Sequence, residues 1–293
     1  MNNLNDIASK SLGDSTSYAV YTDKVDATLL NPMPRELARG DHDIITSGNG
    51  CDVWHCYEAT FLGATGIPQA GVLKIIVPHD SEFIVESKSL KLYLNTYDMV
   101  KFDKSTDYAT SVERDISSLL NCQVTATFFE YSEFENDTIV SRYDIHETVT
   151  NSMSVDSYDG EFSIPPATAV IKGIPITHNI YMPTLRSRCR HTKQKDSGAV
   201  SIIIRTGVAV DVTSIMKYVY SLREVNEFHE FCAEKIYTEV KKAYGGDVAV
   251  HCFYVRRGGI DISPCRYDDF GYDTPVFSGF GNSNVLIKGF QGQ

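Results

Sequence analysis

The chain has 293 residues, with 27 Lys and Arg against 38 Asp and Glu, so its formal net charge is −11 with histidine neutral. This length fits one large domain or two of ordinary size, and 42% hydrophobic residues supply enough apolar surface for a core. The net negative charge argues against nonspecific binding to nucleic acid or to an anionic membrane, because such binding depends on clustered Lys and Arg. We therefore expect a small diffusible partner and no direct contact with nucleic acid.

Neither a membrane span nor an export signal is predicted. No stretch approaches the roughly 18 consecutive apolar residues that a transmembrane helix needs, and residues 1–6 lack the basic and apolar regions of a signal peptide. The seven cysteines are odd in number and widely spread, which does not resemble a disulfide framework. We expect a soluble cytoplasmic protein with reduced thiols.

The first predicted elements form a strand, helix, helix, strand series. Residues 71–77 are apolar and β-branched and stop at Pro78, as a buried strand would. A helix is expected from Ser87, and the residues that recur on its apolar face are Leu90, Tyr93, Leu94 and Tyr97. A second helical face carries Val112, Ile116, Leu119 and Leu120, and residues 124–129 are predicted as the next strand.

The second half of the chain repeats this order. Residues 199–204 are predicted as a strand, and two helical faces follow, formed by Ile215, Tyr218, Val219 and Leu222 and by Phe228, Cys232, Ile236 and Val240. Residues 248–255 are predicted as the closing strand. The repeated order indicates two modules of one design, although elements alternate in many folds and coincidence is the alternative.

A polar segment divides the two modules. Residues 146–159 are rich in Ser, Thr and Asp, a composition typical of a linker or surface loop. Residues 1–45 contain Pro32 and Pro34 and few periodic apolar positions, so we expect them to wrap the surface as an N-terminal arm. The predicted division is an arm over 1–45, a first module over 46–150 and a second module over 160–293.

Cys189 is a candidate nucleophile. It lies in the most basic short run of this acidic chain, 185–196, and nearby cations favour the thiolate over the thiol. An ordinary thiol is the alternative, because Arg188 and Arg190 would point away from the cysteine in an extended segment. Asp196, seven positions on, is either a proton donor or a turn residue.

The segment Asn226-Glu227-Phe228-His229-Glu230 gathers two carboxylates, an aromatic ring and an imidazole at an expected helix start. Such a group can offer an anionic acceptor for the donor edge of a heterocycle, a stacking face and a proton carrier. The alternative is an acid-rich first turn of a solvated helix.

Two further segments could hold phosphate. In Glu86-Ser87-Lys88-Ser89-Leu90-Lys91, backbone N–H groups at a helix start, a hydroxyl and two lysines make a plausible phosphate cradle, while Glu86 could accept hydrogen bonds from a ring. The alternative makes Ser87 an N-cap beside solvated lysines. Arg256-Arg257-Gly258-Gly259 could likewise hold a phosphate or form a charged hairpin turn.

Common metal and nucleotide motifs are absent from the sequence. The spacing of Cys51, His55 and Cys56 does not match a structural zinc site, so no metal is expected. Residues 278–281 lack the strand and helix context of a dinucleotide-binding glycine motif, and there is no P-loop. Any nicotinamide cofactor must be held outside a Rossmann domain.

Together these segments resemble the two-module form of the 7-cyano-7-deazaguanine reductases, the NADPH-dependent nitrile reductases of queuosine biosynthesis. The resemblance covers nearly the whole chain and is most specific at 85–95, 226–230 and 256–262, with a lesser similarity at 29–35. It implies an α+β fold of two tandem tunnelling-fold (T-fold) modules, each an antiparallel sheet backed by two helices. It also implies ligand sites at module or subunit interfaces, and an oligomer, expected to be a homodimer.

The resemblance also implies a role for each candidate residue. Cys189 would attack the nitrile carbon to form a covalent thioimide, Asp196 would supply a proton, His229 would assist proton movement, and NADPH would deliver two successive hydrides. The residues matching the family's substrate-binding positions are Val85, Glu86, Ser87, Phe228, His229 and Glu230, with Glu86 and Glu230 reading the guanine-like edge. The residues matching its NADPH-contacting positions are Ser87, Lys88, Arg257 and Gly258.

The chain departs from the family around the nucleophile. The family usually has an apolar residue after the cysteine and a Pro-Asp-Trp run, whereas this chain has Arg190 and Lys195-Asp196-Ser197. The added charge either suits an acidic variant of the substrate or is drift on a surface loop. Two other functions stay open, namely a T-fold enzyme that adds ammonia to the same nitrile and a non-catalytic module that binds a purine or pterin ring.

Overall fold

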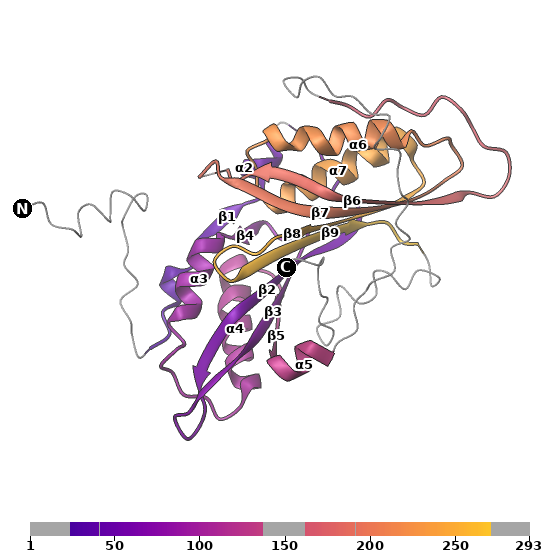
Figure 1. Cartoon of the computed structure of the whole chain (residues 1–293). Coiled ribbons are helices and arrows are strands. Elements are labelled where there is room, and N and C mark those ends of the chain that lie inside the picture. The colour runs from indigo at the N-terminus through magenta and orange to yellow at the C-terminus, as the bar shows by residue number, and fades with distance from the viewer. Residues whose placement is uncertain (1–23, 41, 137–161, 191, 271–293) are drawn as a thin grey trace, which may run out of the picture.

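One continuous antiparallel sheet runs through the computed structural model, which describes residues 24–40, 42–136, 162–190 and 192–270 (Figure 1). The sheet has seven strands in the order β5-β3-β2-β9-β8-β7-β6. In chain order these are β2 (Asn49–Leu62), β3 (Pro68–Pro78), β5 (Thr125–Glu130), β6 (Ile176–Arg188), β7 (Lys195–Thr206), β8 (Asp247–Tyr254) and β9 (Ile260–Tyr267).

The first half follows the predicted order and adds strand β2 to the seven-stranded sheet. Helices α3 (Ser87–Asn95) and α4 (Ser105–Leu120) lie between β3 and β5, as expected, and a short α5 (Tyr131–Asn136) follows β5. Strand β2 was not predicted, because Asp52 and His55 interrupt its apolar pattern. Both side chains are buried and ion-paired to residues distant in the sequence, which local patterning does not reveal.

The second half has the same plan. Strands β6 and β7 are followed by α6 (Val212–Ser221), a 3-10 turn η3 (Leu222–Glu224) and α7 (His229–Tyr244), then by β8 and β9. The predicted strands lie within β7 and β8, whereas β6 and β9 were missed. The first strand of each half carries a register shift against its hairpin partner, in β2 between Cys56 and Ala59 and in β6 between Met182 and Leu185. This shared irregularity supports the interpretation of two modules of one design.

The four long helices cover one face of the sheet. Figure 1 shows α3 and α4 against the strands of the first half, and α6 and α7 against those of the second. Each pair encloses its own apolar core, one around Trp54, Leu73 and Val112 and the other around Ile202 and Ile236. These helices have 9 to 16 residues, and within the described ranges no helix has the length and hydrophobicity to cross a membrane.

The arm contributes to the interior. After a 3-10 turn η1 (Ala27–Leu29), strand β1 (Pro32–Pro34) pairs with β4 (Phe83–Val85), and α2 (Glu36–Arg39) follows. The prediction that the arm wraps the surface is wrong for Leu30 and Arg35, which are buried. Residues 1–23 of the arm and the predicted linker at 146–159 lie outside the described residues.

A buried network of ion pairs connects the arm with the two halves of the chain. Strands β2 and β9 pair in the middle of the sheet, and Asp52 on β2 accepts from Arg35 of the arm at 2.6 Å and from Arg266 on β9 at 2.8 Å. Glu234 on α7 completes the network, with Arg266 at 2.9 Å and Arg39 at 2.8 Å. Although burial by itself raises the pKa of the Asp52 carboxyl, Arg266 and Arg35 hold that pKa below its ordinary value.

We predict that Asp52→Asn lowers the free energy of unfolding by about 3–5 kcal/mol, because it leaves Glu234 alone to balance the buried guanidinium groups of Arg35 and Arg266. The measurement is the midpoint of urea unfolding, followed by the fluorescence of Trp54, the single tryptophan, which is buried on the same strand. Asp43→Asn is the matched control, since Asp43 is 93% exposed in its pair with Lys242 and should contribute less than about 1 kcal/mol. Equal midpoints for the two variants would contradict the prediction.

Candidate active site

Cys189 lies at the tip of the β6–β7 hairpin. Arg188 and Lys195 form the last residue pair of the two strands, and the N–H of Cys189 then donates to the Gln194 carbonyl at 2.8 Å. Side chains alternate along paired strands, which places Cys189, Gln194 and Asp196 on one side of the hairpin. Five of the seven cysteines are buried, whereas Cys189 and Cys122 are partly exposed. Cys189 is therefore a free thiol that a small molecule can reach.

Asp196 is held between His229 and Arg257. Its side chain is buried on β7, where Oδ2 lies 3.3 Å from Nε2 of His229 and Oδ1 accepts from Nη1 of Arg257. The other terminal nitrogen of Arg257 donates to Gln194. Burial alone raises the pKa of the Asp196 carboxyl, but the hydrogen bond and charge of His229 and the guanidinium of Arg257 outweigh it, so the pKa lies below its ordinary value. Asp196 is consequently a carboxylate in this state.

His229 is oriented from two sides. Asp196 binds Nε2, and the imidazole stacks on the ring of Tyr254 with centroids 3.8 Å apart and planes 8° apart. Its Nδ1 is buried and has no hydrogen-bond partner among the described residues. The ring is thus fixed in place, and one of its nitrogens is left without a hydrogen bond among the described residues.

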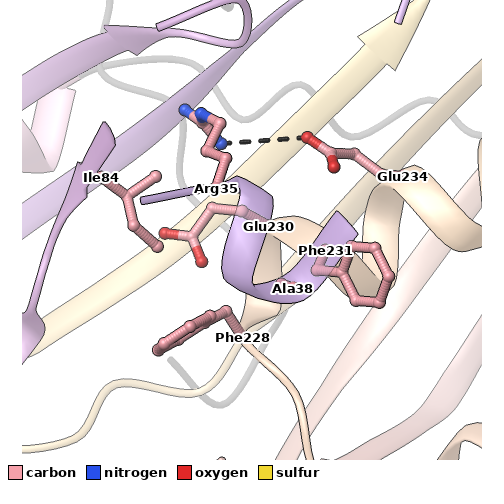
Figure 2. A pocket seen from close by; sticks show the side chains of 7 residues that line it. All are labelled: Arg35, Ala38, Ile84, Phe228, Glu230, Phe231 and Glu234. Atoms are coloured by element: carbon pink, nitrogen blue, oxygen red, sulfur yellow. Dashed lines mark ion pairs between the residues drawn. The ribbon is translucent and has the colours of Figure 1, made fainter. Parts of the chain in front are cut away.

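A small pocket lies beside this group. Its lining residues are Arg35, Ala38, Ile84, Phe228, Glu230, Phe231 and Glu234 (Figure 2). Phe228 is the N-cap of α7 but makes no capping hydrogen bond with its side chain, and Figure 2 shows Glu230 reaching between Ile84 and Phe228. Glu230 is buried, so the interpretation of this segment as a solvated acidic turn is wrong for it.

Glu230 has an unsatisfied carboxyl group. Its Oε1 is buried without a hydrogen-bond partner in the described part of the chain. Burial, reinforced by the negative charge of Asp52, raises the pKa of Glu230 to about 7. A ligand that donates hydrogen bonds here would pair an acceptor that folding has left unpaired.

Two of the positive charges near Cys189 are compensated. Arg190 pairs with Glu227 at 2.8 Å, and its guanidinium carbon lies 5.8 Å from the centroid of Phe228. Arg188 pairs with Glu224 at 2.6 Å. Since both arginines already have carboxylate partners, they do not form a free cationic patch for an acidic substrate, and Arg190 instead braces the pocket ring Phe228.

The start of α3 differs in detail from the expectation. Glu86, and not Ser87, is the N-cap, because its carboxylate accepts from the N–H groups of Lys88 at 3.0 Å and Ser89 at 2.7 Å. Val85 is buried just before it, whereas Ser87 and Lys88 are exposed. Those two N–H groups are taken, so a phosphate here would rely on the Ser87 hydroxyl and on side-chain cations rather than on them.

The segment after β8 is a tight hairpin turn. Arg257 and Ile260 exchange backbone hydrogen bonds, and Gly258 and Gly259 occupy the left-handed region at φ 59° and 81°. Lys91 of α3 donates to the Gly258 carbonyl at 2.7 Å. Arg257 and Gly258 from the second half therefore lie beside the helix that carries Ser87 and Lys88 in the first half. With Lys88, Lys91 and Arg257 nearby, this region fits the phosphates of a dinucleotide.

The structure joins the predicted residues into two contact groups. One group contains Asp196, His229 and Arg257 beside Cys189, and the other contains Phe228 and Glu230 in the pocket. Glu86 and Glu230 are not joined, because the Glu86 carboxylate binds N–H groups of α3 and Oε1 of Glu230 has no hydrogen-bond partner among the described residues. Sequence reasoning missed Arg35, Glu234, Tyr254 and Gln194 as parts of the site, and only Arg35 had a signal, in the similarity at 29–35. No cluster of His, Cys, Asp and Glu able to hold a metal ion occurs within the described residues.

Comparison with family models matches two parts of the chain. Residues 21–128 match the model described as nitrile reductase, 7-cyano-7-deazaguanine-reductase N-term, and residues 201–269 match the model described as QueF-like protein. The matched ranges contain the candidate residues of α3, of α7 and of the turn at 257–260. Cys189 and Asp196 lie between the two ranges.

Individual relatives agree with the family models. The NADPH-dependent 7-cyano-7-deazaguanine reductase of Paraburkholderia phymatum is 34% identical over 252 residues, which cover 84% of this chain and 89% of that protein. Among solved structures, the archaeosine synthase QueF-Like in the apo form matches 33% of this chain and 95% of its own, at 21% identity and a TM-score of 0.29. A TM-score this low carries no argument about the fold.

We predict that Glu230→Gln stabilises the folded protein at pH 8. Burial disfavours the ionised form of Glu230 in the folded state but not in the unfolded state. The contribution of Glu230 to the free energy of unfolding therefore falls as the pH rises from about 4.5 to about 7, and it is constant at higher pH. The gain for the neutral variant should reach on the order of 3 kcal/mol above pH 7 and vanish below pH 4. The measurement is the thermal midpoint as a function of pH, with Glu239→Gln on the same helix as control. A difference independent of pH would overturn the prediction.

Proposed function

The chain belongs to the family of NADPH-dependent 7-cyano-7-deazaguanine reductases, and we propose that Cys189, Asp196 and His229 carry out its nitrile chemistry. The protein reduces the nitrile of 7-cyano-7-deazaguanine to the aminomethyl group of 7-aminomethyl-7-deazaguanine, in queuosine biosynthesis. The observation that carries the residue assignment is the buried Asp196 carboxylate, bound to His229 on the side of the hairpin that bears Cys189.

The first step we propose is addition of the thiol to the nitrile. A bond forms between Sγ of Cys189 and the nitrile carbon, one π bond of the nitrile breaks, and the nitrogen takes a proton to give a covalent thioimide. The thiol loses the proton that the nitrogen gains, so no outside acid is consumed. Asp196, a carboxylate in this state, accepts the thiol proton and returns it to the nitrogen, and His229 relays it.

Reduction then requires protons from the same residues. NADPH, when bound, would supply one hydride, so the reaction consumes two molecules of NADPH in succession. Each hydride added to carbon requires one proton added to nitrogen. We assign delivery of these protons to the Asp196–His229 pair. The residues that would hold NADPH are Ser87, Lys88, Arg257 and Gly258, with Lys91 between α3 and the turn. Attachment to sulfur keeps the reactive carbon in the site until the first hydride has added. The C–S bond then breaks, Sγ of Cys189 leaves as the thiolate, and the second hydride and a proton reduce the resulting imine to the amine.

Recognition of the substrate is assigned to the pocket and to the start of α3. The deazaguanine ring presents N–H and amino donors, and the unpaired Oε1 of Glu230 is a matching acceptor. Phe228, braced by Arg190, would lie against the ring. Glu86, with Val85 and Ser87 beside it, would reach the same donor edge after leaving its capping position. The carboxylates thereby select a guanine-like edge.

The organisation of the protein is proposed on the same basis. We retain the division into an arm at 1–45, a first module at 46–150 and a second module at 160–293. The cofactor residues come from both modules, which supports a site formed where modules meet. We propose a homodimer that acts in the cytoplasm on a free small molecule and does not bind nucleic acid directly, in keeping with the net charge of −11.

Incubation with 7-cyano-7-deazaguanine in the absence of NADPH should increase the intact mass of the protein by the mass of the nitrile. Cys189→Ala should abolish this increase, because it removes the attacking sulfur. Cys122→Ala is the matched control, since Cys122 is the other partly exposed cysteine. An adduct that persists in Cys189→Ala, or that disappears in Cys122→Ala, would refute the assignment of the nucleophile.

Addition of NADPH should convert the adduct to the aminomethyl product and regenerate free Cys189, whereas addition of ammonia alone should not release an amidine. The reason is that Ser87, Lys88 and Arg257 supply hydroxyl and cationic groups for binding NADPH, and an enzyme that adds ammonia does not need such groups. Product identity is measured by mass spectrometry of the small-molecule fraction. Amidine formation without NADPH would favour the ammonia-adding enzyme, and reversible binding without any adduct would favour the non-catalytic binding module.

A further inference from the structure

Arg257 stands between two groups of residues that the proposed function treats separately. Its Nη1 binds Asp196, the proton carrier, and its Nη2 binds Gln194 in the hairpin of Cys189. Its own backbone forms the glycine turn whose Gly258 carbonyl is bound by Lys91 of α3. One side chain therefore connects the proton carrier to the region that fits a dinucleotide.

The exposure of the two partners differs. The Asp196 side chain is 3% exposed, whereas the Arg257 side chain is 41% exposed. A guanidinium with this exposure can turn toward a phosphate outside the protein, and phosphate oxygens compete well for it because they offer two acceptors in the right plane. Asp196 is buried and held on β7, so it cannot move with Arg257 toward such a phosphate.

We propose that Arg257 is a positioning residue shared between Asp196 and the cofactor phosphates, so that occupation of the dinucleotide site frees Asp196 to carry a proton. This proposal rests on the proposed function, since it requires Asp196 to serve Cys189. It links two events that must coincide, because a thioimide formed without a reductant at hand is a dead end for turnover.

The charged surroundings of Asp196 make Arg257 the adjustable partner. The titratable or charged groups that face it are His229 from α7, Arg257 from the β8–β9 turn and Cys189 from the β6–β7 hairpin, while β6 contributes Ser187 directly opposite. His229 is fixed by its stack on Tyr254. Removal of Arg257 leaves His229 as the remaining partner of Asp196, so the pKa of the carboxyl rises and the carboxylate becomes a stronger acceptor for the thiol proton.

The test measures thioimide formation by intact mass, from pH 6 to 9, with 7-cyano-7-deazaguanine and with or without NADP⁺, which cannot donate a hydride. In the wild type, NADP⁺ should accelerate adduct formation. Arg257→Ala should form the adduct about tenfold faster than the wild type without NADP⁺, with the pH profile moved to higher pH, because a rise of one unit in the pKa of Asp196 makes its carboxylate up to about tenfold stronger as a base. NADP⁺ should have no further effect on it.

Two variants separate this role from a structural one. Arg257→Lys keeps the charge on Asp196 and should restore the slow wild-type rate and pH profile without NADP⁺. Arg256→Ala removes a positive charge from the neighbouring residue. The guanidinium carbon of Arg256 lies 4.6 Å from the ring centroid of Tyr57, so this variant should behave as the wild type. Binding of NADP⁺ to each variant is followed by calorimetry, so that loss of binding is seen directly.

The outcomes are distinguishable. An unchanged rate and pH profile in Arg257→Ala overturns the proposal, as does a wild-type rate that NADP⁺ leaves unchanged while calorimetry shows that it binds. Absence of any adduct in the folded wild type overturns the proposed function itself. A faster Arg257→Ala that is restored by Arg257→Lys supports the sharing of Arg257.

Discussion

The buried network around Asp52 is the interaction on which the rest of the structure depends. Arg35 from the arm, Asp52 from β2, Arg266 from β9 and Glu234 from α7 meet where the two halves of the sheet join. A buried charge without a partner costs several kcal/mol, so each member can stay inside only if the others are in place. The network fixes the arm and α7 relative to the sheet, and the pocket lies between them, with Arg35 and Glu234 in its wall.

The site retains groups that folding alone would disfavour. Glu230 keeps a buried oxygen without a hydrogen-bond partner among the described residues, and the negative charge of Asp52 makes ionisation of Glu230 still less favourable. Asp196 is buried as a carboxylate because His229 and Arg257 supply the compensating charges. An unpaired recognition group and a proton carrier with one movable partner both reduce stability, and both are useful for binding and catalysis.

The departures around Cys189 leave this arrangement intact. Arg190 gains Glu227 as its partner and lies over Phe228, so a charged residue supports the pocket ring where the family usually has an apolar one. The Pro and Trp that flank the aspartate in the family are replaced by Lys195 and Ser197, but pairing of β6 with β7 still places Asp196 opposite Ser187. The strand register, rather than the flanking residues, holds Asp196 in position.

The sequence by itself determined the four long helices, the strands β3, β5, β7 and β8, and the family with its reaction, because apolar periodicity and short motifs are local properties. It could not give β2, whose Asp52 and His55 hide the strand pattern, nor the role of Glu86 as N-cap of α3. Only the tertiary structure decided that Arg35 joins the pocket, that Arg190 is neutralised by Glu227, and that Arg257 reaches Asp196. These contacts join residues that are tens to hundreds of positions apart, and their partners are set by sheet register and helix packing, which no local pattern encodes.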